Sequence, residues 1–187
     1  LDVGPTSDDF VTGRPLTDRQ LDFEDLIMFT IEYGTTGGGV APPIAAQQAA
    51  ANADAVVVDA PAHVTSGQTF DVTVRMEGAA RLQGVSLRLA WDGAVASPLH
   101  MTSGGWLESQ LGVVYSPGPG ALDAALLGRR TGGISGRGVL GIFTFRALAE
   151  GSPGVSLASL QARDPSNRSV TLAAPDENRI AAVWDVL

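Results

Sequence analysis

Carboxylates gather near the N-terminus of the chain at a spacing that suits a calcium ion. Asp18, Asp22 and Asp25 fall at relative positions 5, 9 and 12 of a twelve-residue calcium loop, and Leu21 falls at the hydrophobic position 8. Ca²⁺ is a hard cation that takes six to eight oxygen ligands, so a short segment with several carboxylates is a suitable host. The sequence therefore predicts a calcium site with the ligands Asp2, Gly4, Asp18, Gln20, Asp22 and Asp25.

Two of these predicted ligands have no carboxylate to offer. Gln20, at position 7, would supply its backbone carbonyl. Gly4, at position 3, has no side-chain oxygen, so a carbonyl, a water molecule, or a carboxylate from Asp8 or Asp9 would complete the shell. The alternative is a solvated acidic loop before a helix, in which Asp22 is only the N-cap.

An apolar run follows the acidic segment and predicts the helix that leaves the loop. From Leu26 to Tyr33 most residues are apolar, and a helix that is apolar on most sides must be buried. One loop with one helix cannot provide that burial. We therefore expect this helix to pack on the rest of the chain or on a neighbouring chain, and Gly34 to end it.

The remainder of the chain changes to a period-two pattern, which is typical of half-buried strands. We expect three regions: 1–34 for the calcium loop and helix, 35–53 for a Gly/Pro/Ala-rich linker or strap, and 54–187 for a β-domain. Many short strands at regular spacing, with no long helical pattern between them, indicate an antiparallel β-sandwich. The predicted strands span residues 55–59, 70–76, 85–91, 95–100, 113–116, 122–127, 139–148, 155–160, 169–172 and 179–184.

Composition excludes several classes of function. The net charge of −8 argues against a nucleic-acid partner, because phosphates require cationic side chains. The absence of cysteine excludes disulfides, thiolate zinc sites and a cysteine nucleophile. No apolar run is long enough to cross a bilayer. The chain begins at Leu1 without a signal-like segment, which predicts a processed or excised piece of a longer precursor.

Aromatic and titratable residues offer weaker functional patterns. Flat aromatic side chains can stack on sugars. Trp91 lies on the same side of its predicted strand as the apolar residues, so we expect it in the core, whereas Trp106 follows a glycine pair and could be exposed. The aromatic candidates are Trp91, Trp106, Tyr115 and Trp184. No triad-like arrangement or acid pair stands out, so we expect no enzyme activity. The residues weighed for it are His63, His100, Glu108, Glu150 and Glu177. Residues 164–168 predict a turn held by the Asp164 side chain, with a second cation site as the alternative.

With the strands in place, residues 54 to about 185 resemble a cohesin domain, the jelly-roll sandwich of cellulosomal scaffolds. The residues that carry the resemblance are 56–58, 67–74, 82–92 and 138–147. The N-terminal segment is similar to the second half of a dockerin calcium repeat, whose loop ends in aspartate, as Asp25 does here. It departs from that pattern in two ways: an insertion of roughly residues 5–17 splits the loop between positions 3 and 5, and Arg19 stands where a glycine is expected. The resemblance implies an all-β, cohesin-like jelly-roll sandwich preceded by an EF-hand-like calcium loop and helix.

The resemblance also implies a non-catalytic protein-binding or assembly module, stabilised by Ca²⁺. Carboxylate-rich, loosely specified calcium sites suit millimolar calcium, so we expect an extracellular protein, secreted or at the cell surface. The N-terminal segment of one copy could dock on the sandwich of the next, and a head-to-tail contact that does not close gives a filament. Residues 37–53, or an edge strand over 179–187, could also reach a neighbour by β-augmentation.

Two other interpretations stay open. The chain could be a carbohydrate-binding module of a secreted polysaccharide-degrading protein, in which case an aromatic row should be exposed across one sheet. Alternatively, the acidic segment and the sandwich could fold together as one domain whose binding surface lies elsewhere.

Overall fold

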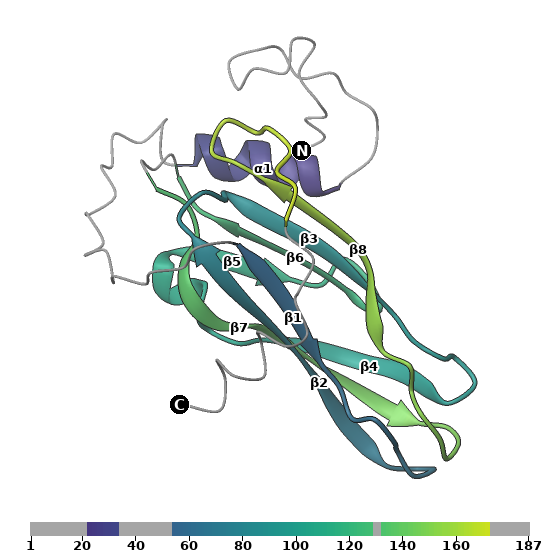
Figure 1. Ribbon diagram of the computed structural model, residues 1–187. Helices are drawn as coiled ribbons and strands as arrows, with labels where there is room; N and C mark the ends of the chain where they lie inside the picture. Colours follow the sequence, from purple (N-terminus) through teal and green to yellow (C-terminus); the bar gives the residue numbers. More distant parts are fainter. Residues whose placement is uncertain (1–21, 34–53, 129–131, 173–187) are drawn as a thin grey trace.

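One α-helix and eight strands make up the part of the chain that the structure describes (Figure 1). The computed structural model describes residues 22–33, 54–128 and 132–172. The helix α1 spans Phe23–Glu32, and a short 3₁₀ turn spans Glu108–Gln110. The strands are β1 (Ala55–Asp59), β2 (Thr69–Ala79), β3 (Gly84–Ala90), β4 (Ala96–Ser103), β5 (Gly112–Tyr115), β6 (Ala121–Leu126), β7 (Ser135–Ala147) and β8 (Ser156–Arg163).

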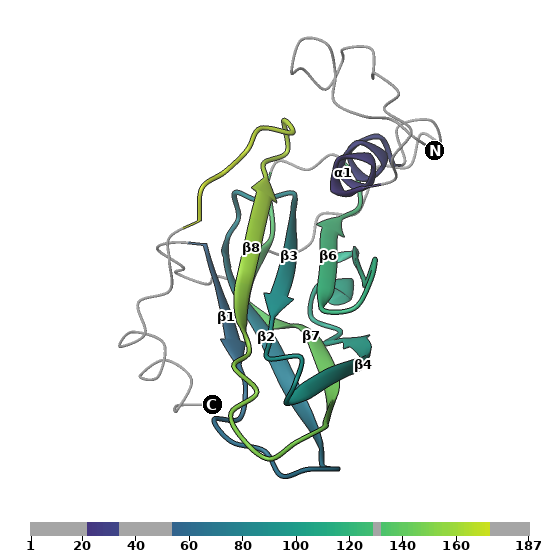
Figure 2. The same ribbon diagram turned by 90° about the vertical axis from the view of Figure 1, so that its right-hand side faces the viewer.

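The strands form two four-stranded sheets that pack face to face. One sheet has the order β1-β2-β7-β4 and the other has the order β5-β6-β3-β8. Every pair of neighbouring strands is antiparallel. Figure 2 shows the β1-β2-β7 side and the β3-β6 side of this sandwich. The predicted β-sandwich is therefore confirmed.

Alternation of side chains along the strands produces the core between the sheets. On β2, Val72, Val74 and Met76 are fully buried, because a strand points every second residue to the same face. Phe145 of β7 stacks with Phe70 of β2 at a centroid distance of 5.5 Å. Trp91 meets Phe145 edge-on at 5.6 Å, so it packs against the core as its parity predicts.

Each of the eight strands overlaps a range that the sequence predicts, and two predicted strands have another outcome. Residues 169–172 do not form a strand: Ser169 makes one isolated bridge with Arg163, and the Val170 amide donates to Ala162. The tight turn before them explains this, because it returns the chain to β8 only briefly. The predicted strand over 179–184 lies outside the described residues.

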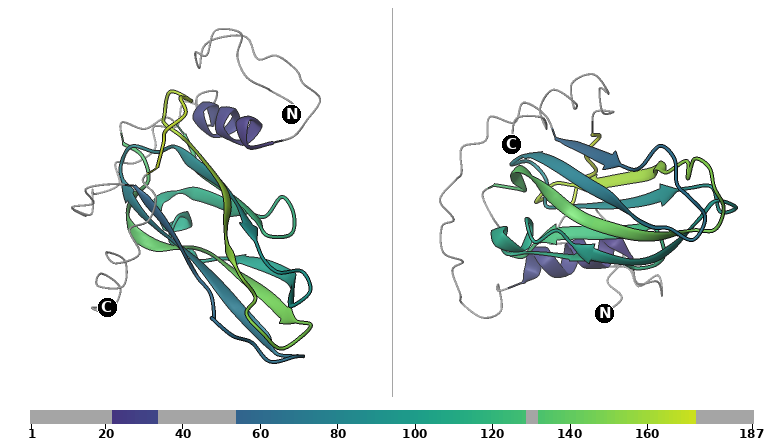
Figure 3. Two further views of the ribbon diagram at one scale, coloured as in Figure 1. Left: turned by 45° about the vertical axis from the view of Figure 1, so that its right-hand side comes forward. Right: turned by 90° about the horizontal axis from the view of Figure 1, so that it is seen from below.

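The helix α1 packs on the outer side of the β5-β6-β3-β8 sheet, at the end of β6. Figure 2 shows it along its axis beside that end, and the left view of Figure 3 places it at one end of the sandwich. Its buried residues Phe23, Ile27 and Ile31 form a small apolar cluster with Ala125, separate from the main core. The expectation that the helix packs on the rest of the chain is thus confirmed.

One expectation about α1 is wrong in part. The sequence predicts burial on most sides, but Phe29 is 44% exposed and Tyr33 is 52% exposed. The sheet can cover only one side of a helix that lies on its surface, so the opposite side remains in contact with solvent. The predicted end at Gly34 lies outside the described residues, and Tyr33 is the C-cap.

Candidate binding surface

The N-terminus of α1 is held by two of the predicted calcium ligands. Asp22 is the N-cap, and one of its carboxylate oxygens accepts from the Glu24 amide at 2.9 Å. Asp25 turns back along the helix, and its Oδ2 accepts from the Asp22 amide at 2.8 Å. This reciprocal pair is a capping box, which satisfies amides that the helix itself leaves without partners. We call Asp22 and Asp25 the capping pair.

The position of the capping pair at the N-terminal end of α1 is compatible with the predicted calcium loop. Both carboxylates lie at the end of α1 where residues 2 to 21 enter, and positions 9 and 12 of the loop have the three-residue spacing of a capping box. The other predicted ligands lie outside the described residues: Asp2, Gly4, Asp18 and Gln20. Within residues 22–33, 54–128 and 132–172, no three acidic or histidine side chains come together as a metal site. Calcium binding therefore stays a prediction.

Small residues on two neighbouring strands make a seat for α1. Gly84 of β3 pairs with Ala125 of β6, and Ile27 of α1 fits over both. A Cβ added at Gly84 would lie 2.6 Å from Cδ1 of Ile27 and 2.7 Å from the Ala124 carbonyl oxygen. Both distances are below van der Waals contact, so only glycine allows the helix this close. We call Gly84 and Ala125 the helix seat.

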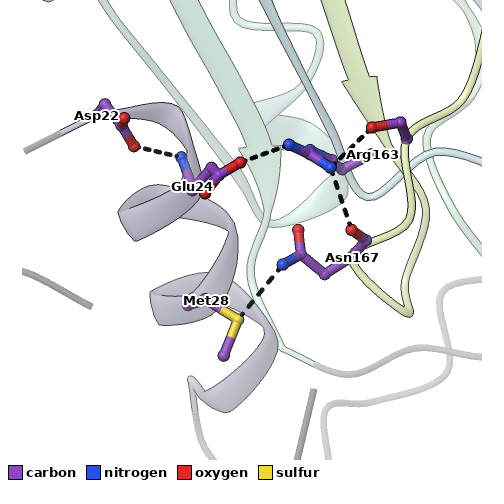
Figure 4. A network of polar contacts seen from close by, with 6 residues as sticks. Asp22, Glu24, Met28, Arg163 and Asn167 are labelled. Carbon is purple, nitrogen blue, oxygen red and sulfur yellow. Dashed lines mark hydrogen bonds and ion pairs between the residues drawn. The ribbon is translucent and has the colours of Figure 1, made fainter. Parts of the chain in front are cut away.

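Polar contacts hold α1 to the turn that follows β8 (Figure 4). Arg163 Nη2 lies 2.6 Å from Oε1 of Glu24, and Arg163 Nη1 donates to Ser169 Oγ at 2.8 Å. Asn167 Nδ2 lies 3.6 Å from the sulfur of Met28. These contacts join segments far apart in sequence, so they fix where α1 lies on the sheet.

The turn after β8 is organised as the sequence predicts. Asp164 Oδ1 accepts from the amides of Ser166 at 2.8 Å and Arg168 at 2.9 Å. This is a turn held by an aspartate side chain, and it presents Asn167 to α1.

A polar row crosses the same sheet beside the helix seat. The strand register places Tyr115, Asp123, Ser86 and Gln161 side by side on the four strands β5, β6, β3 and β8. Asp123 is only 4% exposed and receives hydrogen bonds from Ser86 and Tyr115. The alternation of β6 places this row on the outer face, because Leu122 and Ala124 face the core.

Burial and neighbouring charges shift the pKa values of two residues in this row, Asp123 and Tyr115. Burial raises the pKa of the Asp123 carboxyl, and the hydrogen bonds from Ser86 and Tyr115 and the charge of Arg88 oppose this rise in part. Burial, followed by the adjacent Asp123 charge, raises the pKa of Tyr115 to about 12. The carboxylates of the capping pair raise the pKa of Tyr115 further, so the N-terminus of α1 and the polar row share one electrostatic environment.

The described aromatic residues do not form an exposed row for sugar stacking. Trp91 and Trp106 are both half-buried against the core. Trp106 lies directly over Gly138, where an added Cβ would meet its ring, so the predicted exposure of Trp106 is wrong. Tyr115 is 37% exposed and bonds Asp123, and Trp184 lies outside the described residues.

The titratable residues weighed for catalysis lie on ordinary surface positions. His63 and His100 are exposed and lie on different segments. Glu108 accepts a hydrogen bond from the Ser103 hydroxyl, Glu150 is exposed, and Glu177 lies outside the described residues. No helix in the described ranges is long and apolar enough to cross a membrane.

Sequence reasoning missed the helix seat, the polar row and the Glu24–Arg163 pair. The first two depend on which residues of different strands become neighbours, and the third depends on where α1 lies on the sheet. Neither is visible in the period-two pattern. Two signals were present: Gly84 at the start of a strand, and Asp123 inside the otherwise apolar run 121–126.

Comparison with known proteins identifies the fold. No family model and no curated protein matches the sequence. A type II cohesin domain from the cellulosome of Acetivibrio cellulolyticus matches with a TM-score of 0.50 at 14% identity, over 65% of this chain and 90% of that chain. A type II cohesin–X-dockerin complex from the same organism matches equally, with a TM-score of 0.50 at 14% identity, over 64% and 91%.

A non-cellulosomal cohesin from the archaeon Archaeoglobus fulgidus matches with a TM-score of 0.45 at 20% identity, over 64% of this chain and 91% of that chain. The two structures from Acetivibrio cellulolyticus, each at a TM-score of 0.50, establish the likeness in fold. The chain thus has a cohesin-type β-sandwich with a helix seated on one of its sheets.

Proposed function

We propose that this chain is a non-catalytic, extracellular protein-binding module whose sandwich receives a helix. The observation that carries the proposal is α1 itself, which lies on the outer face of β5-β6-β3-β8 with Ile27 over the helix seat. The sheet therefore has the shape and apolarity needed to bind a helix. One structure of similar fold is a cohesin–dockerin complex, which supports a protein as the ligand.

We propose further that the helix received can come from another copy. The contacts between α1 and the sheet would be identical whether the helix belongs to the same copy or to the next one. Residues 33 to 54 separate α1 from β1. These twenty-two residues reach at most about 75–80 Å when extended, which is enough to span to a neighbouring sandwich. Such a head-to-tail contact extends into a filament when it does not close.

Calcium would stabilise this contact by ordering the segment that leads into α1. The ligands would be Asp2, Gly4, Asp18, Gln20, Asp22 and Asp25, with a purely structural role for the ion. The support is the direction of the capping pair and the density of carboxylates before it. Calcium that binds when α1 is seated would stabilise the seated helix by mass action, whichever copy it is seated on.

Complementation between two variants tests the exchange of α1. Ala125→Leu fills the helix seat but leaves α1 unchanged, whereas Ile27→Asp prevents α1 from seating but leaves the seat open. We expect wild-type protein at high concentration to form oligomers by light scattering, and each variant alone to be monomeric. Mixed in equal amounts, they should form a heterodimer that grows no further. If wild type stays monomeric at millimolar concentration, or the mixture stays monomeric, the exchange of α1 is wrong.

Calcium dependence is tested separately by melting and mass measurements with Ca²⁺ and with EDTA. We expect EDTA to lower the melting temperature and to reduce the oligomer mass. Asp18→Ala should abolish both responses, because it removes a predicted side-chain ligand but not the capping pair. If EDTA changes neither quantity in the wild-type protein, the calcium part of the proposal fails while protein binding is still open to test.

A further inference from the structure

The row of residues that forms the helix seat continues onto β8 with a charged side chain. Gly84 of β3 lies opposite Ala125 of β6 on one side and opposite Arg163, the last residue of β8, on the other. Residues that lie opposite each other on neighbouring strands point to the same face of a sheet. Arg163 therefore stands on the outer face beside the helix seat, on the edge strand of the sheet that carries α1.

The sandwich itself holds the guanidinium of Arg163 in place. Its Nη1 donates to Ser169 Oγ at 2.8 Å and to the Asn167 carbonyl oxygen at 3.4 Å. Neither acceptor belongs to α1, so these bonds orient Arg163 whether or not a helix is seated. Its Nη2 is directed to the helix and donates to Glu24 Oε1 at 2.6 Å (Figure 4). The sandwich thus presents one oriented, cationic donor to the helix on its seat.

The ion pair between Arg163 and Glu24 is largely removed from solvent. The two side chains are 18% and 26% exposed. A charge-assisted hydrogen bond is stronger in such a place than on the open surface, and removal of one partner leaves the other partly desolvated. A basic residue in place of Glu24 would bring two like charges together at the same point, which is less favourable still. The pair therefore favours one sign of charge on the seated helix and disfavours the other.

We propose that Arg163 selects the helix that the sandwich receives: it favours a helix whose first apolar residue is followed directly by a carboxylate, and it disfavours a basic residue there. In α1 these two residues are Phe23 and Glu24, and the further apolar contacts follow at Ile27 and Ile31. The partner is thus a helix with apolar residues at positions one, five and nine and an acidic residue at position two. The inference rests on the proposed function, because it names the kind of helix that the seat takes.

Charge reversal on the full chain tests the selection. The variants are Glu24→Arg, Arg163→Glu and the two together. The control is Glu150→Arg, which makes the same change of charge at an exposed site between β7 and β8. Hydrogen exchange of the α1 amides measures how often the helix leaves the seat. We expect each single reversal to raise this opening at least about tenfold and the control to match wild type. The double reversal should open at least about fivefold less than the product of the two single effects.

A second measurement separates charge selection from the exchange of α1 between copies. The donor is Ala125→Leu and the receiver is Ile27→Asp. Glu24→Arg added to the donor should raise the dissociation constant of the heterodimer at least about tenfold, and Arg163→Glu added to the receiver should then lower it. If no heterodimer forms but hydrogen exchange shows the coupling, the exchange of α1 is wrong and charge selection is confirmed for the helix of the same copy. If the single reversals leave the opening of α1 unchanged, or their effects simply multiply in the double variant, charge selection is wrong even where the heterodimer forms.

Discussion

Truncation of Ile27 should release α1 from the sandwich without unfolding the sandwich. Ile27 is fully buried between α1 and the helix seat, and truncation of a buried isoleucine to alanine costs about 2–5 kcal/mol. With ten residues, α1 is too short to be stable when undocked, so the cost falls on its docked state. The opening equilibrium of α1 should rise by about 30-fold to several thousand-fold, since each 1.4 kcal/mol is a factor of ten.

Hydrogen exchange measures this effect residue by residue. In Ile27→Ala, amides in the second half of α1 should lose protection by that factor, while amides of β2 and β7 should keep theirs. The reason is that the apolar cluster of α1 is separate from the main core. Phe29→Ala is the matched control, because Phe29 is on the same helix but 44% exposed, and it should change protection little.

Two results would refute this reasoning. If protection in β2 falls together with that in α1, the helix and sandwich unfold as one cooperative unit. If Ile27→Ala leaves α1 protected, the helix seat is not what holds the helix.

Four further predictions concern the sandwich and the polar row. Ala80 has a φ of 60°, a left-handed conformation that disfavours side chains, so Ala80→Gly should stabilise the protein by up to about 1 kcal/mol in denaturant unfolding. The buried Asp54 carboxylate accepts from the Ala79 amide at 2.7 Å, so Asp54→Ala should destabilise by about 1–3 kcal/mol and Asp54→Asn by less. Because the folded pKa of Tyr115 is raised to about 12, its contribution to stability is fully present below pH 10 and is lost as the pH rises towards 12; ultraviolet titration should show the late ionisation. Asp123→Asn should bring that ionisation to lower pH and, because burial raises the Asp123 pKa, should stabilise the protein near pH 7 and not at low pH.

The sheets could be predicted from the sequence because each strand carries its own signal. On β2 the alternation of apolar and polar residues reports directly which face is buried. The strand β7 begins at Ser135, whereas the sequence predicts a start at residue 139. The prediction starts late because the first residues of the strand include two glycines and an arginine, which give no alternation of apolar and polar residues. Ser169 to Leu172 has β-like composition, but the turn at Asp164 limits its pairing to one bridge.

The helix seat could not be predicted in the same way. Its members Gly84 and Ala125 are distant in sequence, as is Ile27, which covers them, and only the register of β3 with β6 makes the two seat residues neighbours. The strand β6 is buried at every position, whereas a surface strand alternates; the reason is that α1 and the polar row cover its outer side. The only sequence signal for this cover is the mainly apolar composition of residues 121–126, and it does not say which segment supplies the cover.

The acidic N-terminus shows why one pattern of residues can support two interpretations. A capping box joins an N-cap to the residue three places later, and the last two side-chain ligands of a calcium loop have the same spacing. Asp22 and Asp25 therefore satisfy both, and the capping observed between them is expected with or without an ion. Capping gives no role to Asp2 and Asp18, which precede it. Asp18 takes no part in the capping box, so calcium-dependent melting that disappears in Asp18→Ala must arise from the ion and not from capping.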